Sequence, residues 1–563
     1  MFKFLLFLLP LFIIGCGSTS INNTQPVADA GKFQYLDTSS TVYLDGSASS
    51  DEDHDVLSFQ WSFVNKPIGS SAFLTSETSI QPSFFADKEG NYILKLIVND
   101  GEVDSEPAFV TISTITFVDP STGPQANNII YTPDSNTMRK QPMIAILLEF
   151  SNQKFNSTNE VWRNKLFGTT QGTLNHYYHE ISANQFEFDP VNDQGNVVGG
   201  IVKVDFSNNP NFNQHPDPNI DITSEYHPYL KAAIESVSLN DSFDFSIYDT
   251  TPQDGKITPN ELIVLFIMAG GEDAYSGELS GNGIWAHQWC TNSSDTPNVN
   301  GVKVMQCDPS GIAEGNYAVF GEQHYDVDNY KNITASHDAS IGIIAHELGH
   351  STFNLPDLYY GSSTRIGYYG LMANGSWGQV SSNGVPGDTP THMTAWSKID
   401  TGWYTASSNS NNPTIDIPLD ATGTSTYSIV KTPLYNSNDE YFLVENRGDV
   451  GYDAGLKFVN PAFSGGVAIW HIDEAVIRTR RPSNNINLST SRKGVDLEEA
   501  AGNSVDYGNG DPVLNLYYSG NVDMFTPNTL PSTNLYSNER SLIFFTDISS
   551  ISDTMSIRIN NPL

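Results

Sequence analysis

The stretch that most constrains this chain is IAHELGHSTFNLPDLY, at residues 344–359. Its two histidines, His346 and His350, are four residues apart, so an α-helix would place them on one face about one turn from each other. Glu347 follows the first histidine, where it could reach a metal-bound water without binding the metal itself. This H-E-x-x-H pattern predicts a catalytic zinc site in which Glu347 takes a proton from the water and passes it to a leaving amine. The alternative is a chance match in a helix whose histidines are hydrogen-bonded within the core.

The pattern does not fix the third ligand that a catalytic zinc site usually has. A metzincin would have glycine at 353 and histidine at 356, whereas this chain has Phe353 and Pro356. Asp357 could serve if the turn after the helix were one residue longer. Glu445 could also serve, because a glutamate inside the apolar, strand-like segment FLVE needs a partner, which could be a metal or Arg447.

Length and charge narrow the class of protein. The chain has 563 residues, which suggests two or three domains, and 38% of them are hydrophobic, enough for large buried cores. With 64 acidic and 27 basic residues, the formal net charge is -37. This charge argues against binding to nucleic acid and to anionic lipid surfaces, because both would repel the protein. It suits an extracellular, cation-rich medium.

The N-terminus predicts export. Residues 1–15 have one lysine and then an apolar run that is too short to span a bilayer, as in a signal peptide. Gly15 before Cys16 resembles a bacterial lipobox, which predicts a lipoprotein anchored through Cys16, with residues 16–25 as a tether and the lipid as its sole membrane contact. The alternative is an ordinary signal peptide. Glycine at 17 resembles Gram-negative lipoproteins of the outer membrane, so we expect an outer-membrane or cell-surface location. In that oxidising setting, Cys290 and Cys307 are expected to form a disulfide.

Two modules follow the tether. Residues 26–115 have short alternating segments separated by Gly, Asp and Ser turns, which predicts a β-sandwich, and they resemble a polycystic-kidney-disease (PKD) domain, an immunoglobulin-like module. Asp51, Asp53 and Asp55 alternate there and could bind Ca²⁺ or face solvent. Residues 116–140 are rich in Pro, Gly and Asn and are interpreted as a linker. Residues 141–563 mix helices and strands, as in an α+β domain, with a central strand in QPMIAILLEF and a buried strand at 261–271.

A set of segments after residue 141 resembles one family. In order these are HELGH with LPDLY, GLMANGSWG, TAWSKIDTGW, EYFLVENR, GVAIWHIDE and VDLEEAAG, and together they resemble the immune inhibitor A family of secreted zinc metallopeptidases. The resemblance implies a zincin-like α+β domain with a β-rich C-terminal half. It implies zinc bound by His346, His350 and a downstream glutamate that matches Glu445, and it therefore favours Glu445 over Asp357. Met372 in GLMANGSWG resembles a Met-turn, an apolar floor beneath the metal.

A second ion site is predicted at residues 244–262. Asp249, Asp254 and Glu261 in this segment resemble an EF-hand loop with one inserted residue, and the alternative is a turn before the next strand. We therefore expect Zn²⁺ for chemistry and Ca²⁺ for stability.

The whole pattern predicts a monomeric, extracellular zinc endopeptidase that acts on proteins or peptides. The rival hypothesis is a surface adhesin on an inactive peptidase scaffold, against which stands the intact set of His346, Glu347 and His350.

Overall fold

The structure of the protein is a computed structural model that describes two compact units, residues 1–119 and 120–563. It describes residues 23–561 except for 32–33, 89, 116–127, 135–137, 217–221, 251–252, 277–282, 293, 308–316, 329–331, 381–383, 411–413, 435–436, 502–504 and 507. The predicted signal peptide and Cys16 lie outside the described residues. Within them, no helix has the length and apolar character that crossing a membrane requires.

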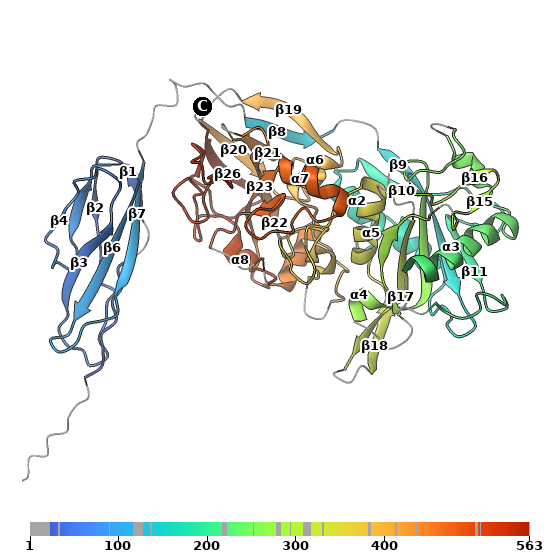
Figure 1. The fold of residues 1–563 in the computed structure, drawn as a ribbon, viewed down its shortest axis with the longest axis horizontal. Helices are drawn as coiled ribbons and strands as arrows, with labels where there is room; N and C mark the ends of the chain where they lie inside the picture. Colours follow the sequence, from blue (N-terminus) through green and yellow to red (C-terminus); the bar gives the residue numbers. More distant parts are fainter. Residues whose placement is uncertain are drawn as a thin grey trace, which may run out of the picture. The chain divides into compact units, whose positions relative to one another are not determined.

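The first unit is a β-sandwich, as its alternating segments predict (Figure 1). One sheet has the order β1 (Gln34–Asp37), β7 (Ala108–Ile115), β6 (Gly90–Asn99) and β3 (Ser58–Asn65). The other has β2 (Ser40–Tyr43), β5 (Ser83–Ala86) and β4 (Leu74–Thr75). Every second residue of β6 is buried, and Trp61 of β3 packs into the same core. Because one face of such a strand is buried and the other is partly exposed, apolar and polar residues tend to alternate along it, and this alternation in the sequence predicts the sandwich.

The linker prediction for 116–140 is wrong in its second half. Residues Asn128–Pro133 form strand β8, which pairs with β19 (Tyr404–Ser410) on one side and β21 (Ile429–Pro433) on the other. Arg139 already begins β9 (Arg139–Glu149). The apolar run in β8 is short and flanked by residues typical of turns, so its strand character comes from pairing with segments almost 300 residues away.

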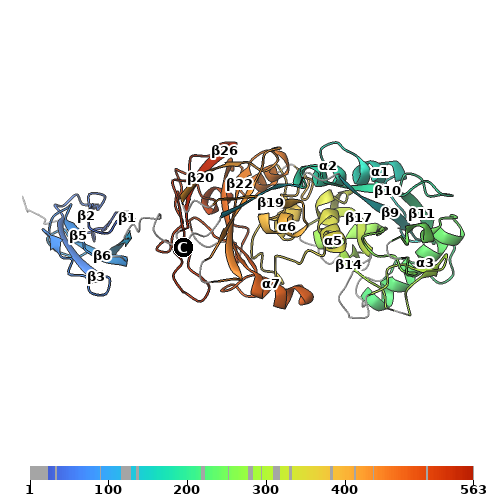
Figure 2. The same cartoon turned by 90° about the horizontal axis from the view of Figure 1, so that it is seen from above.

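The second unit is built on a mixed eight-stranded sheet (Figures 1 and 2). Its main path is β10 (Phe186–Pro190), β9, β12 (Ile263–Glu272), β17 (Tyr317–Val327) and β14 (His287–Trp289). Three short strands join this path: β11 (Ile201–Asp205) on β9, β13 (Gly283–Ile284) on β12 and β18 (Ile333–Asp338) on β17. Strands β9 and β12 were both predicted from their apolar runs. All ten residues of β12 are buried, as expected for a strand covered on both faces.

Helices cover both faces of this sheet. Alternate residues of β9 and β12 enter two different cores. One core is shared with α1 (Asn159–Phe167), α2 (Leu174–Ile181) and α5 (Ile341–Phe353), and Figure 2 shows α1 and α2 along that side. The other core is shared with α3 (Ile222–Leu239). Helix α5, which carries HELGH, is therefore packed on a rigid sheet.

The C-terminal part is rich in strands, as predicted. A six-stranded antiparallel sheet has the order β19, β8, β21, β22 (Glu440–Gly448), β23 (Gly465–Asp473) and β24 (Val495–Leu497). One face of this sheet joins the core that contains α5. The other face packs with the small sheet β20 (Thr414–Asp420), β26 (Thr554–Asn560) and β25 (Phe544–Thr546).

Candidate metal centre

Helix α5 holds the two histidines on its buried side. Ser340 is its N-cap, and Asn354 ends it in the left-handed conformation, with its N–H bonded to the carbonyls of Gly349 and His350. Gly342 permits a close approach, since a Cβ there would lie 1.8 Å from the backbone oxygen of Ser376. Gly349 lies against Met372, whose sulfur would be 2.6 Å from an added Cβ. Met372 thus contacts the helix at Gly349, between the histidines. Its role as a floor beneath the metal stays a prediction.

Three ligand atoms converge at this helix. The distance between His346 Nε2 and His350 Nε2 is 3.2 Å, and Asp357 Oδ1 lies 3.2 Å from each of them. Backbone carbonyls fix both rings, since His346 Nδ1 is 2.9 Å from the oxygen of Leu371 and His350 Nδ1 is 2.6 Å from that of Leu355. A carbonyl can only accept, so each Nδ1 carries a proton, and each Nε2 is the atom that faces the centre and that a metal would bind.

This arrangement fits a metal ion. A tetrahedral ion with bonds of about 2.0–2.1 Å separates its ligand atoms by roughly 3.3 Å, close to the three distances found here. When both Nε2 atoms are unprotonated, two imidazole lone pairs and a carboxylate face one another, and this arrangement is repulsive unless a cation lies between them. Among the described residues, His346, His350 and Asp357 form the one group of three His, Cys, Asp or Glu residues close enough to share an ion.

The short distances between these charged groups and their burial shift the pKa values of His350, Asp357 and Glu347. Burial alone would lower the pKa of His350, but the charge and hydrogen bond of Asp357 outweigh it and raise that pKa to about 9. Burial would raise the pKa of Asp357, but His350 and His346 hold it below its usual range. Glu347 is not a member of the three-residue group. Burial raises the pKa of its carboxyl, although the charges of the two histidines act to lower that pKa. Glu347 is 6% exposed and lines the cleft described below.

The other carboxylate oxygen of Asp357, Oδ2, is fixed by hydrogen bonding. Asn484 Nδ2 donates to Asp357 Oδ2 at 2.6 Å, and the Asp357 N–H donates to Asn484 Oδ1 at 2.6 Å. Tyr359 lies close enough to Asp357 to feel its charge, and its ring lies 6.1 Å from that of His346. Sequence reasoning missed both residues. Tyr359 could have been found two positions beyond Asp357, whereas Asn484 lies 127 residues away and no local pattern points to it.

The preference for Glu445 as third ligand is corrected by the structure. Its carboxylate is fully buried within β22 and takes no part in the group at α5. One oxygen accepts from Trp470 Nε1 at 2.8 Å and lies 3.4 Å from Arg447, and the other bonds to the Tyr427 hydroxyl and lies 3.5 Å from Lys398. A buried glutamate does need a partner, but protein donors supply it here. The second choice, Asp357, is the carboxylate that meets the histidines.

The calcium candidates form no comparable group in the part of the chain that the structure describes. Asp249 accepts from the N–H groups of Asp254 and Gly255, and Glu261 accepts from those of Thr250 and Thr258. In the first unit, Asp51 accepts from the N–H groups of Asp53 and Asp55. These contacts are those of turns closed by carboxylates. Calcium binding stays a prediction.

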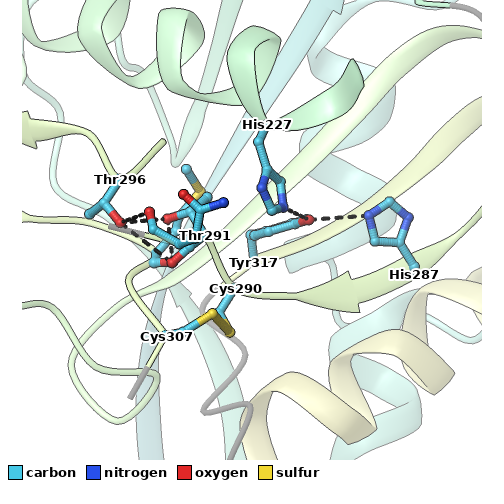
Figure 3. The surroundings of a disulfide bond; sticks show 9 residues. His227, His287, Cys290, Thr291, Thr296, Cys307 and Tyr317 are labelled. Carbon is cyan, nitrogen blue, oxygen red and sulfur yellow. Dashed lines mark hydrogen bonds between the residues drawn. A yellow bond between two sulfur atoms is a disulfide. The ribbon is translucent and has the colours of Figure 1, made fainter. Parts of the chain in front are cut away.

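The metal centre opens into a cleft of about 710 Å³. One wall is the segment that leads into β14, with Trp285 and Trp289 exposed, and the other is α7 (Glu474–Arg480) with the turn that follows it. His287 of the first wall is fixed by a chain of hydrogen bonds, in which its Nε2 lies 3.3 Å from the Tyr317 hydroxyl and that hydroxyl lies 3.0 Å from His227 Nε2 (Figure 3). Burial lowers the pKa of His287 to about 4, so its ring is neutral at physiological pH.

The predicted disulfide between Cys290 and Cys307 is present in the structure and begins directly after Trp289 (Figure 3). It ties the end of the β14 wall to the segment that follows β16 (Val302–Lys303). Trp470 and His471, in the GVAIWHIDE segment of the resemblance, lie away from this wall in the buried strand β23.

Comparisons with known proteins agree with these two modules. Residues 98–404 match the family model described as immune inhibitor A peptidase M6, catalytic domain, which is more than half of the chain. Residues 30–114 match a second family model, which describes a PKD domain.

Curated relatives and solved structures cover smaller parts. The pre-pro-metalloprotease PrtV of Vibrio cholerae serotype O1, from strains M66-2 and ATCC 39315 / El Tor Inaba N16961, is 27% identical over 143 residues. The alignment spans 24% of this chain and 13% of PrtV. The PKD domain of the KIAA 1837 protein is 26% identical, with a TM-score of 0.16, over 18% of this chain and 96% of that one. A PKD domain of human KIAA0319 is 14% identical, with a TM-score of 0.16, over 20% and 96%. At these TM-scores the solved structures support no conclusion about this chain.

Proposed function

Because the chain belongs to the immune inhibitor A family of M6 metallopeptidases, we propose that it is a zinc-dependent endopeptidase that cleaves proteins outside the cell. One observation carries the proposal. His346, His350 and Asp357 present three atoms at mutual distances of 3.2 Å to an open cleft that Glu347 also lines. The α5 helix packed on a mixed sheet is consistent with a zincin-like fold.

The residues of the metal centre have two roles, metal binding and proton transfer. His346 Nε2, His350 Nε2 and Asp357 Oδ1 would hold Zn²⁺, which when bound polarises a carbonyl and makes water more acidic. Glu347 is the base, because burial raises the pKa of its carboxyl and so strengthens its hold on a proton. Its carboxylate accepts the proton of the attacking water and delivers it to the leaving amine nitrogen.

The cleft walls can hold an extended peptide. Strand β14 is at the end of the sheet path and pairs with β17, so its outer edge has backbone groups that a substrate strand can bond. Tyr359 lines the same cleft. Burial and the nearby charges of Asp357 and Glu347 raise the pKa of its hydroxyl, which therefore stays protonated. It can donate to the oxygen on which negative charge develops.

The location outside the cell is supported by the sequence of the N-terminus. The short apolar run before Gly15-Cys16 and the Cys290–Cys307 disulfide both suit an exported lipoprotein. We propose that the lipid on Cys16 is the membrane contact and that proteins or peptides are the substrates.

Hydrolysis of an unfolded protein by the purified, zinc-loaded chain tests the proposal. Glu347→Gln should keep its zinc and lower kcat/KM by roughly 100- to 10,000-fold, because it removes the base without removing a ligand. Glu160→Gln, the same change on the surface of α1, is the matched control and should keep full activity. A folded, zinc-loaded wild type that cleaves no protein would refute the proposal, and so would a Glu347→Gln variant with the wild-type rate.

A further inference from the structure

Asn484 makes a reciprocal pair of hydrogen bonds with Asp357. The side-chain amide donates to Oδ2 and its oxygen accepts the N–H of the same residue, each at 2.6 Å. An amide turned the other way would set donor against donor and acceptor against acceptor, so the contact fixes the orientation of both side chains. With Oδ2 held in this way, Oδ1 is the oxygen that faces His346 and His350.

The segment around Asn484 holds the whole ligand loop. Arg481 donates to the oxygen of Asn354 at 2.8 Å and pairs with Asp400. Asn487 Nδ2 donates to the oxygen of Leu358 at 3.1 Å. Backbone oxygens before and after Asp357 are therefore bonded by residues on either side of Asn484.

The backbone of Asn484 is suited to this contact. It ends the short helical turn Arg481–Ser483 with φ of 49° and ψ of 42°, the left-handed conformation that asparagine tolerates better than most residues. Its side chain is thus aimed at Asp357 by a turn that follows α7 and contains Pro482.

We propose that Asn484 is a positioning residue that sets the affinity of the metal centre by orienting the Asp357 carboxylate. The inference rests on the proposed zinc site. It assigns a role to a residue beyond the span 98–404 that matches the catalytic-domain family model. Partners of metal-bound carboxylates typically change metal affinity or activity by about 10- to 100-fold when they are removed.

Zinc affinity measured by chelator competition tests the proposal without reference to activity. Asn484→Gly removes the amide and suits the left-handed backbone, whereas Asn484→Ala removes the amide and adds backbone strain. Both variants should raise the zinc dissociation constant by about 10- to 100-fold. The unfolding temperature of the metal-free protein should fall less for Asn484→Gly than for Asn484→Ala, because both variants lose the two hydrogen bonds and only alanine adds backbone strain.

Asn538→Gly is the matched control. Asn538 is also exposed and left-handed, with φ of 63°, and the same change there should leave the zinc dissociation constant unaltered. An unchanged constant in Asn484→Gly would overturn the proposal, as would a loss confined to Asn484→Ala, which would assign the effect to backbone strain. Absence of peptidase activity in the wild type would refute the proposed function and leave this inference standing on the zinc measurement.

Discussion

At the scale of single residues, two carboxylates have opposite roles: Asp357 is half-buried and Glu445 is fully buried. Asp357 faces two imidazole nitrogens, and Glu445 faces an ammonium, a guanidinium, a phenol and an indole. A carboxylate with protein donors on both oxygens has nothing left for a metal, whereas the buried Oδ1 of Asp357 faces only the Nε2 atoms of His346 and His350. The two side chains should therefore respond differently to the same chemical change.

Asp357→Asn and Glu445→Gln should separate zinc binding from stability. Asp357→Asn removes one of three ligands and should raise the zinc dissociation constant by on the order of 100-fold or more, while the fold persists. Glu445→Gln should keep its zinc but lose about 3–5 kcal/mol of unfolding free energy, because Lys398 and Arg447 stay buried without their partner. Zinc titration and urea unfolding of each variant measure the two effects. Zinc loss in Glu445→Gln at an unchanged fold would restore Glu445 as a ligand.

His346, Glu347 and His350 could be predicted from sequence because one helical turn carries all three. The choice between Asp357 and Glu445 could not, because the deciding contacts are distant along the chain. Lys398 is 47 residues from Glu445, and Trp470 is 25 residues from it. A glutamate in an apolar strand signals that a partner exists, but not which one.

At the scale of elements, β22 and β23 are joined by a buried charged pair. His471 Nε2 lies 3.0 Å from Glu440 of β22, and its Nδ1 lies 3.3 Å from Glu498, just after β24. Burial would lower the pKa of His471, but the two carboxylates raise it to about 9. The folded-state pKa is thus above the unfolded value of about 6.5. Protonation of His471 therefore contributes its full stabilisation below about pH 6.5, and this stabilisation is lost as the pH rises through 9.

His471→Gln should therefore show a pH-dependent loss of stability. The gap in unfolding free energy between wild type and variant should be about 1–3 kcal/mol larger at pH 6 than at pH 10, because the wild type loses its cation over that range. Urea unfolding at the two pH values measures the gap. A gap that stays constant would show that packing against the Tyr536 ring, 4.3 Å from His471, is the whole contribution.

Element prediction succeeded where one pattern was long enough. The apolar run in β12 and the alternation in β6 each determine their structure locally. Strand β14 has only three residues, and β8 has six with turn-forming neighbours, so their pairing partners decide their conformation.

At the scale of the whole molecule, the two units divide at residues 119 and 120 rather than at 140. Strand β8 belongs to the second unit because it lies between β19 and β21 in the six-stranded sheet. Without it, those two strands would each lose a hydrogen-bonded neighbour, and buried groups such as Asn128 and the partly buried Tyr131 would be missing from the core. Removing an inner strand exposes two edges, which is a greater loss than removing an outer one.

Two truncated chains test this boundary. A chain that begins at Pro120 keeps β8 and should match the full-length protein in zinc affinity and in the unfolding temperature of the peptidase unit. A chain that begins at Met138 keeps all of β9 but lacks β8, and it should unfold at least roughly 10 °C lower or aggregate. Differential scanning calorimetry and zinc titration compare the three proteins. Equal unfolding temperatures for the two truncated chains would mean that β8 contributes little, as the linker prediction for residues 116–140 implies.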